Sequence, residues 1–430
     1  MGLLTFRGGI HPDDGKALSR EKPITAIQAG PKLYYSMSQH IGAPAKPVVS
    51  KGDHVCRGQK IAEAGGFVSA PVHATVSGTV KGIEKMRMPG GNLADCIVVE
   101  NDGQMEEVEY REASLDSLSK EEILKRISEA GFPTHVKLAP KNPEDIDYIL
   151  VNGAECEPYL TSDYRRMLEE PEKIVAGLQV ILKVFPKAKG CICIEDNKPD
   201  CIRMMEECAK GDSRIEVKTL KTKYPQGAER MLIYAVTGRK INSSMLPADA
   251  GCIVDNVDTV VAVCQAALKG KPLMERIMTV TGDAVKEPRN FLVPLGMLHQ
   301  EVVNAAGGFR QEPQKVISGG PMMGKAMFSL DVPVIKTSSA ILAMAEDEVS
   351  KNPPTACINC GRCVKVCPGQ ILPVRLAEFA DHGDEEKFLA YHGMECCECG
   401  CCSFVCPAKR QLTQSISSMR KIMLAKRKKG

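Results

Sequence analysis

The chain has 430 residues, of which 43% are hydrophobic and 25% charged, an ordinary composition for a soluble globular protein. Its length predicts about two to four domains. The net charge of +3, the aromatic content of 4% and the absence of Trp argue against a nucleic-acid-binding surface, which would need positive charge and aromatic rings for base stacking.

The cysteine content and the N-terminal sequence indicate a cytosolic protein. Nineteen cysteines are present, and Met1–Ile10 lacks the cationic start and apolar stretch of a secretory signal. No apolar run reaches the about 18 residues of a membrane-spanning helix, and Thr259–Leu268 and Ile341–Ala345 are predicted to be core. If the protein functions at a membrane, we therefore expect it to dock on the membrane or on partner subunits there. The basic tail Met419–Lys429 predicts a solvated helix end, with contact to an acidic lipid surface or partner as the alternative.

The N-terminal part of the chain is predicted to be rich in β-structure. Residues 1–30 form an irregular N-terminal extension with several Gly and Pro turn signals. In residues 31–110, short β-type runs alternate with Gly and Pro, which predicts a barrel-sandwich domain. Its paired halves resemble the hammerhead fold of biotinyl and lipoyl carriers. The tip between the halves, Glu63–Phe67, lacks the lysine that a carrier needs, so we expect a docking or scaffolding domain.

The remaining chain divides into three predicted units. Residues 111–250 alternate amphipathic helices with short apolar strands, which predicts an α/β domain with ligands at the carboxyl ends of its strands. Residues 251–345 are predicted to form a small β-rich module. Residues 346–430 carry two cysteine runs separated by two helical stretches.

The two cysteine runs are the most specific motif in the sequence. Each has the form C-x₂-C-x₂-C-x₃-C-P, and every cysteine of the second lies 39 residues after its counterpart in the first. This is the spacing of bacterial two-cluster ferredoxins, in which the fourth cysteine ligates the other cluster. We therefore expect two [4Fe–4S] clusters, with these ligands: Cys357, Cys360, Cys363, Cys367, Cys396, Cys399, Cys402 and Cys406.

Other interpretations of the cysteines are weaker. Zinc prefers two ligands from each of two separated knuckles, and disulfides do not suit a cytosolic chain. Most of the eleven cysteines outside the ligand set lie in apolar contexts and are predicted to be small buried hydrophobes. Cys397 and Cys401 lie inside the second run, but the repeat assigns them no ligand role.

Three polar segments of the α/β region are candidates for ligand contacts. They are Gly131–Lys137 after an amphipathic helix, Asn152–Tyr159 after an apolar strand, and Tyr224–Arg230 with Asp255-Asn256-Val257 downstream. Polar residues at strand ends are where a planar cofactor would be held in an α/β layer. Each segment is weak by itself, because turns also attract Gly, Pro and Asn.

At these segments the chain resembles the C subunit of the Rnf complex, a membrane-bound ferredoxin:NAD⁺ oxidoreductase that pumps sodium ions or protons. It is more distantly similar to the flavin-binding subunit of respiratory complex I. The motifs FRGGIHP, GFPTHVKL, NGAECEPYLTSD, YPQGAERML, SGGPMMG and both cysteine runs occur in order. The resemblance implies a hammerhead domain, an α/β domain for FMN and NADH, a β-grasp module and a helical two-cluster domain.

The resemblance also implies roles for individual residues. Asn152 and Glu155 would approach the flavin, and Gly227 and Glu229 would lie near the flavin and nicotinamide. Asn256 would bond the flavin ring or ribityl chain. Two further expected contacts lie in the GFPTHVKL segment: Gly131, and Lys137, which would face phosphate or ribityl oxygens. The complex I pattern has an Asp where this chain has Ala154, so that hydrogen bond must be missing or replaced.

One departure from the family pattern bears directly on cofactor binding. The family usually reads GIVGxGGAGFPTHVKL, whereas this chain reads KRISEAGFPTHVKL. Glycine lets a backbone approach phosphates closely and adopt positive φ. Without those glycines we expect weaker FMN and NADH binding, unless another segment fills the gap.

The resemblance leaves three functional hypotheses. The first is a peripheral oxidoreductase subunit on the cytoplasmic face of the membrane, which exchanges electrons with NAD(H) through FMN and two clusters. Its implied partners are integral-membrane subunits and a ferredoxin-like subunit. The second is a relay and docking subunit with clusters but no flavin site. The third is a soluble paralogue that feeds electrons from NADH to a cytosolic reductase.

Overall fold

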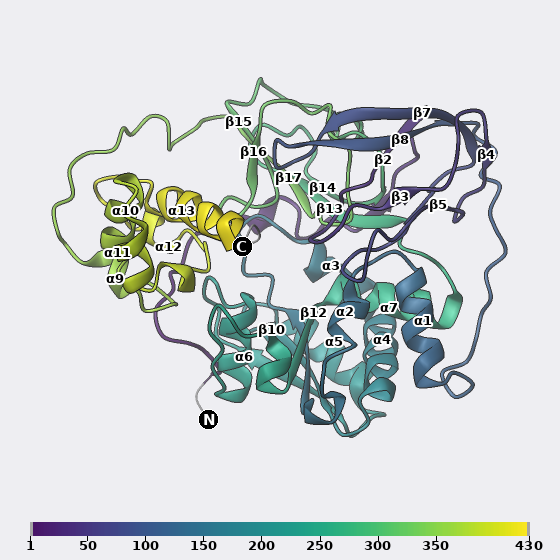
Figure 1. The fold of residues 1–430 in the computed structure, drawn as a ribbon, viewed down its shortest axis with the longest axis horizontal. Helices are drawn as coiled ribbons and strands as arrows, with labels where there is room; N and C mark the ends of the chain where they lie inside the picture. Colours follow the sequence, from purple (N-terminus) through teal and green to yellow (C-terminus); the bar gives the residue numbers. More distant parts are fainter. Residues whose placement is uncertain (1–2, 428–430) are drawn as a thin grey trace.

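The structure is a computed structural model that describes residues 3–427. The helices from α9 (Arg362–Lys365) to α13 (Leu412–Arg427) lie together at one end of the molecule, and strands β7 (Gly78–Arg87) and β8 (Leu93–Asn101) lie at the other (Figure 1). The α/β unit with helices α1 (Lys120–Glu129), α4 (Pro171–Val184) and α7 (Val257–Lys269) lies beneath the β-rich units in this view. Within the described residues, none of the helices is long and apolar enough to cross a bilayer.

The hammerhead domain consists of two small sheets that share one core. The four-stranded sheet has the order β2 (Lys32–Ser36), β8 (Leu93–Asn101), β7 (Gly78–Arg87) and β4 (His54–Val55). The three-stranded sheet has the order β3 (Lys46–Pro47), β5 (Lys60–Glu63) and β6 (Val72–His73). Leu33, Ile61 and Ile97 are fully buried between them. The lysine-free tip Glu63–Phe67 begins at the end of β5 and leads toward β6.

The α/β domain is built on a four-stranded parallel sheet. Its order is β11 (Ile215–Leu220), β10 (Lys189–Glu195), β9 (Tyr148–Gly153) and β12 (Cys252–Asn256). Alternate residues of β9 enter different cores: Ile149 and Val151 pack with one set of helices, and Leu150 packs with α6 (Glu229–Thr237). The helices that pack on the first face are α1 (Lys120–Glu129), α3 (Ser162–Glu169), α4 (Pro171–Val184), α5 (Pro199–Ala209) and α7 (Val257–Lys269). The parallel strands place their carboxyl ends along one edge.

The boundary expected at residue 251 divides this domain. β12 pairs with β9 from Cys252 to Asn256, and α7 packs against α4 through the shared apolar core. The α/β unit therefore continues to Lys269 in the structure. The expected boundary was too early because the apolar part of β12, Cys252–Val254, is only three residues long and fits a strand of either unit equally well.

The β-rich module is a six-stranded sheet of mixed direction. Its order is β1 (Ile24–Ala26), β14 (Arg289–Pro294), β13 (Glu275–Thr281), β17 (Ala340–Met344), β15 (Lys315–Ser318) and β16 (Lys325–Met327). Val302 and Val303 of α8 (His299–Ala305) are buried in its core. β1 comes from the N-terminal extension and pairs in parallel with β14. The expectation of an irregular extension was therefore wrong for Ile24–Ala26, whose three residues are too few to show a period.

The cluster domain is helical, as expected. Its helices are α9 (Arg362–Lys365), α10 (Pro373–Asp381), α11 (Glu385–Ala390), α12 (Cys401–Phe404) and α13 (Leu412–Arg427). α10 packs against α13 through Leu376, Ile416 and other buried residues. The basic tail is the last part of α13, with Lys428 and Lys429 outside the described residues. The remaining short elements are α2 (Thr134–Lys137), η1 (Lys16–Leu18), η2 (Pro143–Asp145), η3 (Pro247–Ala250) and η4 (Gly393–Glu395).

Candidate functional site: two cysteine cavities and a strand edge

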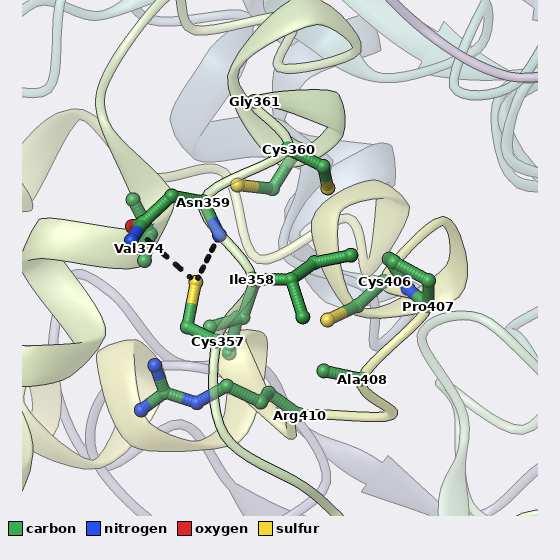
Figure 2. Close-up of a pocket in the computed structure, with 12 residues that line it drawn as sticks. Cys357, Ile358, Asn359, Cys360, Gly361, Val374, Cys406, Pro407, Ala408 and Arg410 are labelled. Carbon is green, nitrogen blue, oxygen red and sulfur yellow. Dashed lines mark hydrogen bonds between the residues drawn. The ribbon is translucent and has the colours of Figure 1, made fainter.

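The first three cysteines of the first run and the last cysteine of the second run line one cavity of about 100 Å³. Figure 2 shows Cys357 and Cys360 beside Cys406, and Cys363 also lines the space. The backbone N–H of Asn359 donates to Cys357 Sγ at 3.4 Å. Three thiols of one run thus meet the fourth thiol of the other, which is the arrangement that the spacing predicts.

The second cavity has the complementary composition. Cys396, Cys399 and Cys402 line it together with Cys367 of the first run. The backbone N–H of Glu398 donates to Cys396 Sγ at 3.4 Å, which matches the Asn359 bond of the first run. N–H···S bonds of this kind tune cluster potential. Cys397 and Cys401 also line this cavity, a position that the repeat did not predict.

The backbone repeats along with the cysteines. Left-handed residues recur at the same places in the two runs, so each loop bends in the same way and turns its thiols toward one point. The corresponding pairs, each 39 residues apart, are Asn359 (φ 54°) and Glu398 (φ 56°), Gly361 (φ 71°) and Gly400 (φ 82°), and Gln370 and Lys409 (both φ 53°).

The two cavities differ in exposure. Cys357 and Cys360 of the first cavity are exposed. All four thiols that meet in the second cavity, Cys367 with Cys396, Cys399 and Cys402, are buried. We call these the outer cavity and the inner cavity. A cluster in the outer cavity would meet a partner directly, whereas one in the inner cavity would be shielded by the chain.

At the carboxyl edge of the sheet, Asn152 and Gly227 are joined directly. Asn152 Nδ2 donates to the carbonyl oxygen of Gly227 at 2.8 Å, and its Oδ1 accepts from the N–H of Ala154 at 3.2 Å. The Gly227 N–H donates to Cys156 Sγ at 3.3 Å. Burial raises the pKa of this thiol to about 12, so it stays protonated. Lys198 Nζ also donates to the carbonyl oxygen of Ala154, at 2.7 Å, so Asn152 and Lys198 both hold this turn.

Lys137, Glu229 and Asp255 form a charged group at the same edge. Lys137 Nζ donates to Asp255 Oδ1 at 3.2 Å and to Val254 O at 2.6 Å, and lies 4.0 Å from Glu229 Oε1. Burial acts to lower the pKa of Lys137, but the two carboxylates outweigh it and raise that pKa. Two side-chain atoms, Asp255 Oδ2 and Nε2 of Gln226, the residue before Gly227, are buried without a hydrogen-bond partner in the described part of the chain. Such orphaned polar atoms are what a bound polar ligand would satisfy.

Glu155 is committed to the protein interior. Its Oε1 accepts the N–H groups of Asp163 and Tyr164 at the start of α3, at 2.8 and 3.2 Å. Its Oε2 pairs with Lys16 Nζ at 3.3 Å. Lys16 lies in the N-terminal extension, where nothing in the sequence marked it. The carboxylate that was expected beside a flavin therefore ties the extension to α3.

Asn256 caps α7 and contacts the carboxyl group of Asp163. Its Oδ1 accepts the Asp258 N–H at 2.9 Å, and its Nδ2 donates to Asp163 Oδ2 at 2.7 Å. Burial, with a contribution from Glu155, raises the pKa of Asp163 to about 7. Asp163 follows the NGAECEPY turn, and only its position in that motif could have drawn attention to it.

Gly131 faces the hammerhead domain. Its φ is +88°, and a Cβ there would lie 2.8 Å from the carbonyl oxygen of Pro71. Before it, α1 remains helical to Glu129, and the Ala130 N–H donates to the carbonyls of Arg126 and Ile127. The Ala130 N–H is therefore used inside the helix and is not available to a phosphate.

The strand edge and the inner cavity are in contact. Tyr224 OH donates to the carbonyl oxygen of Cys399 at 2.7 Å. On the other side, Glu395 accepts from Arg230 Nη1 at 3.0 Å and from the Ser243 hydroxyl at 2.6 Å. The loop that carries Gly227 is thus attached to the second cysteine run.

Comparison with protein families divides the chain in the same way. The RnfC barrel sandwich hybrid domain matches residues 4–104, and the Nuo51 FMN-binding domain matches residues 120–265. The SLBB domain matches residues 277–326, and the 4Fe-4S dicluster domain matches residues 356–409. Two [4Fe–4S] clusters and a flavin-type α/β domain are therefore family features of this chain.

Among solved structures, the chain is similar to an NAD⁺-reducing [NiFe]-hydrogenase in the H₂-reduced state, with 16% identity, a TM-score of 0.48 and coverage of 72% of this chain and 64% of that one. Two curated relatives are much more similar. The C subunit of the proton-translocating ferredoxin:NAD(+) oxidoreductase complex of Clostridium ljungdahlii is 46% identical over 87% of this chain and 84% of the relative. The C subunit of the Na(+)-translocating complex of Acetobacterium woodii is 43% identical over 99% and 98%. The chain therefore belongs to the family of C subunits of Rnf-type, ion-translocating ferredoxin:NAD(+) oxidoreductase complexes.

Proposed function

We propose that this chain is the electron-transfer subunit of a membrane-associated Rnf-type complex, and that it passes electrons between NAD(H) and a partner redox subunit. The observation that carries this proposal is the pair of cysteine cavities, each completed by the fourth cysteine of the other run. Crossed ligation holds two clusters close together, as in two-cluster ferredoxins. The ligands we assign are the eight cysteines of the two runs.

We place FMN at the carboxyl edge of the α/β sheet. Asn152 and Gly227 would border the ring, and Lys137 with Glu229 would set the charge beside it. The orphaned Asp255 Oδ2 and Gln226 Nε2 support this placement, because each needs a polar partner. Bound FMN would supply the step from two-electron hydride chemistry to one-electron transfer.

The exposure of the cysteines supports an order of transfer. The inner cavity adjoins the strand edge through Tyr224 and Cys399, and the outer cavity holds the exposed Cys357 and Cys360. Electrons would pass between the strand edge and the inner cluster, then the outer cluster, then the partner. The partner redox subunit would be ferredoxin-like, and integral-membrane subunits would carry the ion.

We further propose that the chain docks on the cytoplasmic face of the membrane. Its relatives are subunits of ion-translocating complexes, and the helices that the structure describes are not membrane-spanning. Docking through partner subunits satisfies both observations. The exposed thiols of the outer cavity, Cys357 and Cys360, would place a cluster where it can exchange electrons with a docked partner subunit.

A second function, a cluster-only relay, is favoured by one observation. Helix α1 continues to Glu129, and the Ala130 N–H bonds back to the helix, so this residue would give the phosphate of FMN no backbone donor. In that case the residues at the carboxyl edge of the α/β sheet would serve only to attach the cluster domain to the α/β domain. The two functions differ in flavin content and share the clusters.

Anaerobic purification followed by cluster and FMN reconstitution separates the two functions. We expect about eight irons per chain, extractable FMN and NADH-driven reduction of an artificial acceptor. Lys137→Met should lower flavin retention without changing iron content, and Lys51→Met, at an exposed position away from the edge, is the matched control. A protein with its full iron content but no flavin would support the cluster-only relay. Absence of iron and acid-labile sulfide would contradict both.

A further inference from the structure

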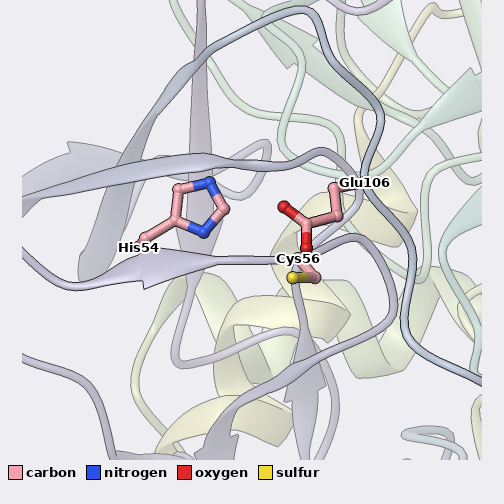
Figure 3. A group of neighbouring side chains, drawn as sticks. All are labelled: His54, Cys56 and Glu106. Atoms are coloured by element: carbon pink, nitrogen blue, oxygen red, sulfur yellow. The ribbon is translucent and has the colours of Figure 1, made fainter.

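A group of potential metal ligands lies in the hammerhead domain, outside the cysteine runs. His54, Cys56 and Glu106 each offer one ligand atom, and these atoms lie within 4.8 Å of one another (Figure 3). His54 and Cys56 are two residues apart on an extended segment, so their side chains share one face. Val55 between them is fully buried on the other face. The sequence analysis assigned none of these three residues a role.

The backbone beneath these side chains is fixed on both segments. β4 pairs with β7 at His54 and Val55, and the Cys56 N–H donates to Gln59 Oε1 at 3.0 Å. The Glu106 N–H donates to Ser77 Oγ at 3.1 Å, and its carbonyl oxygen accepts from the Arg57 N–H at 2.7 Å. The three side chains therefore start from positions set by hydrogen bonds on each strand or loop.

Asp102 orients the imidazole. Its Oδ2 lies 3.1 Å from His54 Nε2, while its Oδ1 accepts from the Ser77 hydroxyl at 2.6 Å and the Gln104 N–H at 2.8 Å. Metal-binding histidines commonly bond a carboxylate through the nitrogen that does not hold the metal. This pairing leaves Nδ1 as the nitrogen available to an ion.

We propose that His54, Cys56 and Glu106 bind a zinc ion, with Asp102 as the positioning residue for His54. Imidazole and thiolate ligands select zinc over magnesium or calcium, which prefer oxygen donors. A tetrahedral zinc with bonds of about 2.0–2.3 Å holds its ligand atoms about 3.3–3.8 Å apart. The three ligand atoms lie within 4.8 Å of one another, and small rotations of the His54 and Glu106 side chains, which are both exposed, would bring them into that range. Because His54 and Glu106 are exposed, a water molecule would supply the fourth ligand.

The test is zinc binding by the full chain after its clusters have been assembled anaerobically. Equilibrium dialysis against Zn²⁺, with zinc and iron counted together, should give one zinc per chain. Zinc-edge X-ray absorption should show a single sulfur at about 2.3 Å among nitrogen and oxygen ligands. Cys56→Ser and His54→Ala should abolish this zinc and leave the iron unchanged. Cys208→Ser, at a half-buried cysteine outside all three sites, is the matched control and should keep it.

Asp102→Asn tests the positioning role. It should weaken zinc binding about 10- to 100-fold and leave the X-ray absorption spectrum of the bound zinc unchanged, because the three ligands stay the same. If Asp102 served only to hold the fold, its replacement would disturb the ligand positions and change that spectrum. Zinc that persists in Cys56→Ser with several sulfur ligands would belong to cysteines of the runs and would overturn the proposal. A holoprotein that binds no zinc would overturn it as well.

Discussion

The hydroxyl of Tyr224 donates a hydrogen bond of 2.7 Å to the carbonyl oxygen of Cys399. Tyr224 belongs to the loop that carries Gly227, and Cys399 belongs to the second cysteine run. The Tyr224 side chain is only 1% exposed, so this bond lies in the interior of the contact between the α/β and cluster domains. This bond joins the strand edge to the inner cavity.

Tyr224→Phe removes this bond and leaves the Cys399 carbonyl without its buried donor. A buried acceptor left unpaired costs about 1–3 kcal/mol, which corresponds to a fall of roughly 2–6 °C in the melting midpoint of the holoprotein. Iron content should be unchanged, and a chelator should remove the inner cluster faster. Tyr391→Phe, which alters an exposed ring, is the control. An unaltered midpoint and chelation rate would show that this hydrogen bond does not stabilise the contact between the domains.

The crossed cysteine arrangement follows from sequence alone because it is a matter of spacing. Four thiols at fixed intervals, repeated 39 residues later, have few ways to meet, and the two cavities of the structure have the composition that the spacing predicts. Helix α1 could also be predicted, since Ser119 accepts the Glu122 N–H as an N-cap before an amphipathic run. Local chemistry decides both features.

Long-range pairings could not be predicted in the same way. β12 joins the α/β sheet through its register with β9, about a hundred residues earlier in the chain. Only Cys252, Ile253 and Val254 of this strand are apolar, and so short a run does not indicate which strand it pairs with. Lys16 pairs with Glu155 across a comparable distance, in a segment that reads as turns. The flavin contact expected for Glu155 was inferred from the NGAECEP motif. Its observed ion pair with Lys16 depends instead on how the N-terminal extension packs against the α/β domain.

The crossed arrangement predicts how single ligand variants behave. Cys367→Ser should disturb the cluster held by Cys396, Cys399 and Cys402, and Cys406→Ser should disturb the other one. Electron paramagnetic resonance of the reduced protein should show one altered signal in each variant, and a different one in each. Cys208→Ser is the control. If Cys367→Ser alters the cluster of its own run, the ligation does not cross.

The difference in exposure predicts a difference in chemical lability. Cys357 and Cys360 are exposed, whereas the four thiols of the inner cavity are buried, so an oxidant such as ferricyanide should bleach the outer cluster at least several-fold faster. Anaerobic stopped-flow absorption should give two phases. The Cys406→Ser variant should alter the fast phase, and Cys367→Ser the slow one. A single phase in the wild-type protein would mean that the chain does not shield the inner cluster.

Lys137 and Asp255 predict a double-variant effect at the strand edge. The Lys137 side chain is 46% exposed and Asp255 is 2% exposed, so Lys137→Met leaves a buried carboxylate without its cation. After allowance for solvent at the lysine, the loss should be about 1–3 kcal/mol, seen as a lower melting midpoint. Lys137→Met with Asp255→Asn should recover most of it, and the Lys51→Met control should lose nothing. A double variant that melts below the single one would show that Asp255 contributes independently of the lysine.

Asp163 predicts a pH dependence with a definite sign. Its pKa of about 7 in the folded chain lies above the value of about 3.9 for an unfolded aspartate. Folding therefore favours the protonated carboxyl: the contribution of Asp163 to stability is complete below about pH 4 and declines as pH rises toward 7. Between pH 5.5 and 8 the wild-type protein should lose about 2 kcal/mol relative to Asp163→Asn.

The Asp163→Asn variant isolates this effect because its amide oxygen still accepts the hydrogen bond from Asn256 Nδ2. Melting midpoints of the two holoproteins at pH 5.5 and at pH 8 give the measurement, and the gap between them should widen in favour of the variant at the higher pH. Asp13→Asn, at an exposed position, should track the wild-type protein at both. A gap that stays constant would mean that the Asp163 carboxyl is ionised throughout, and that the burial around it is offset by Asn256.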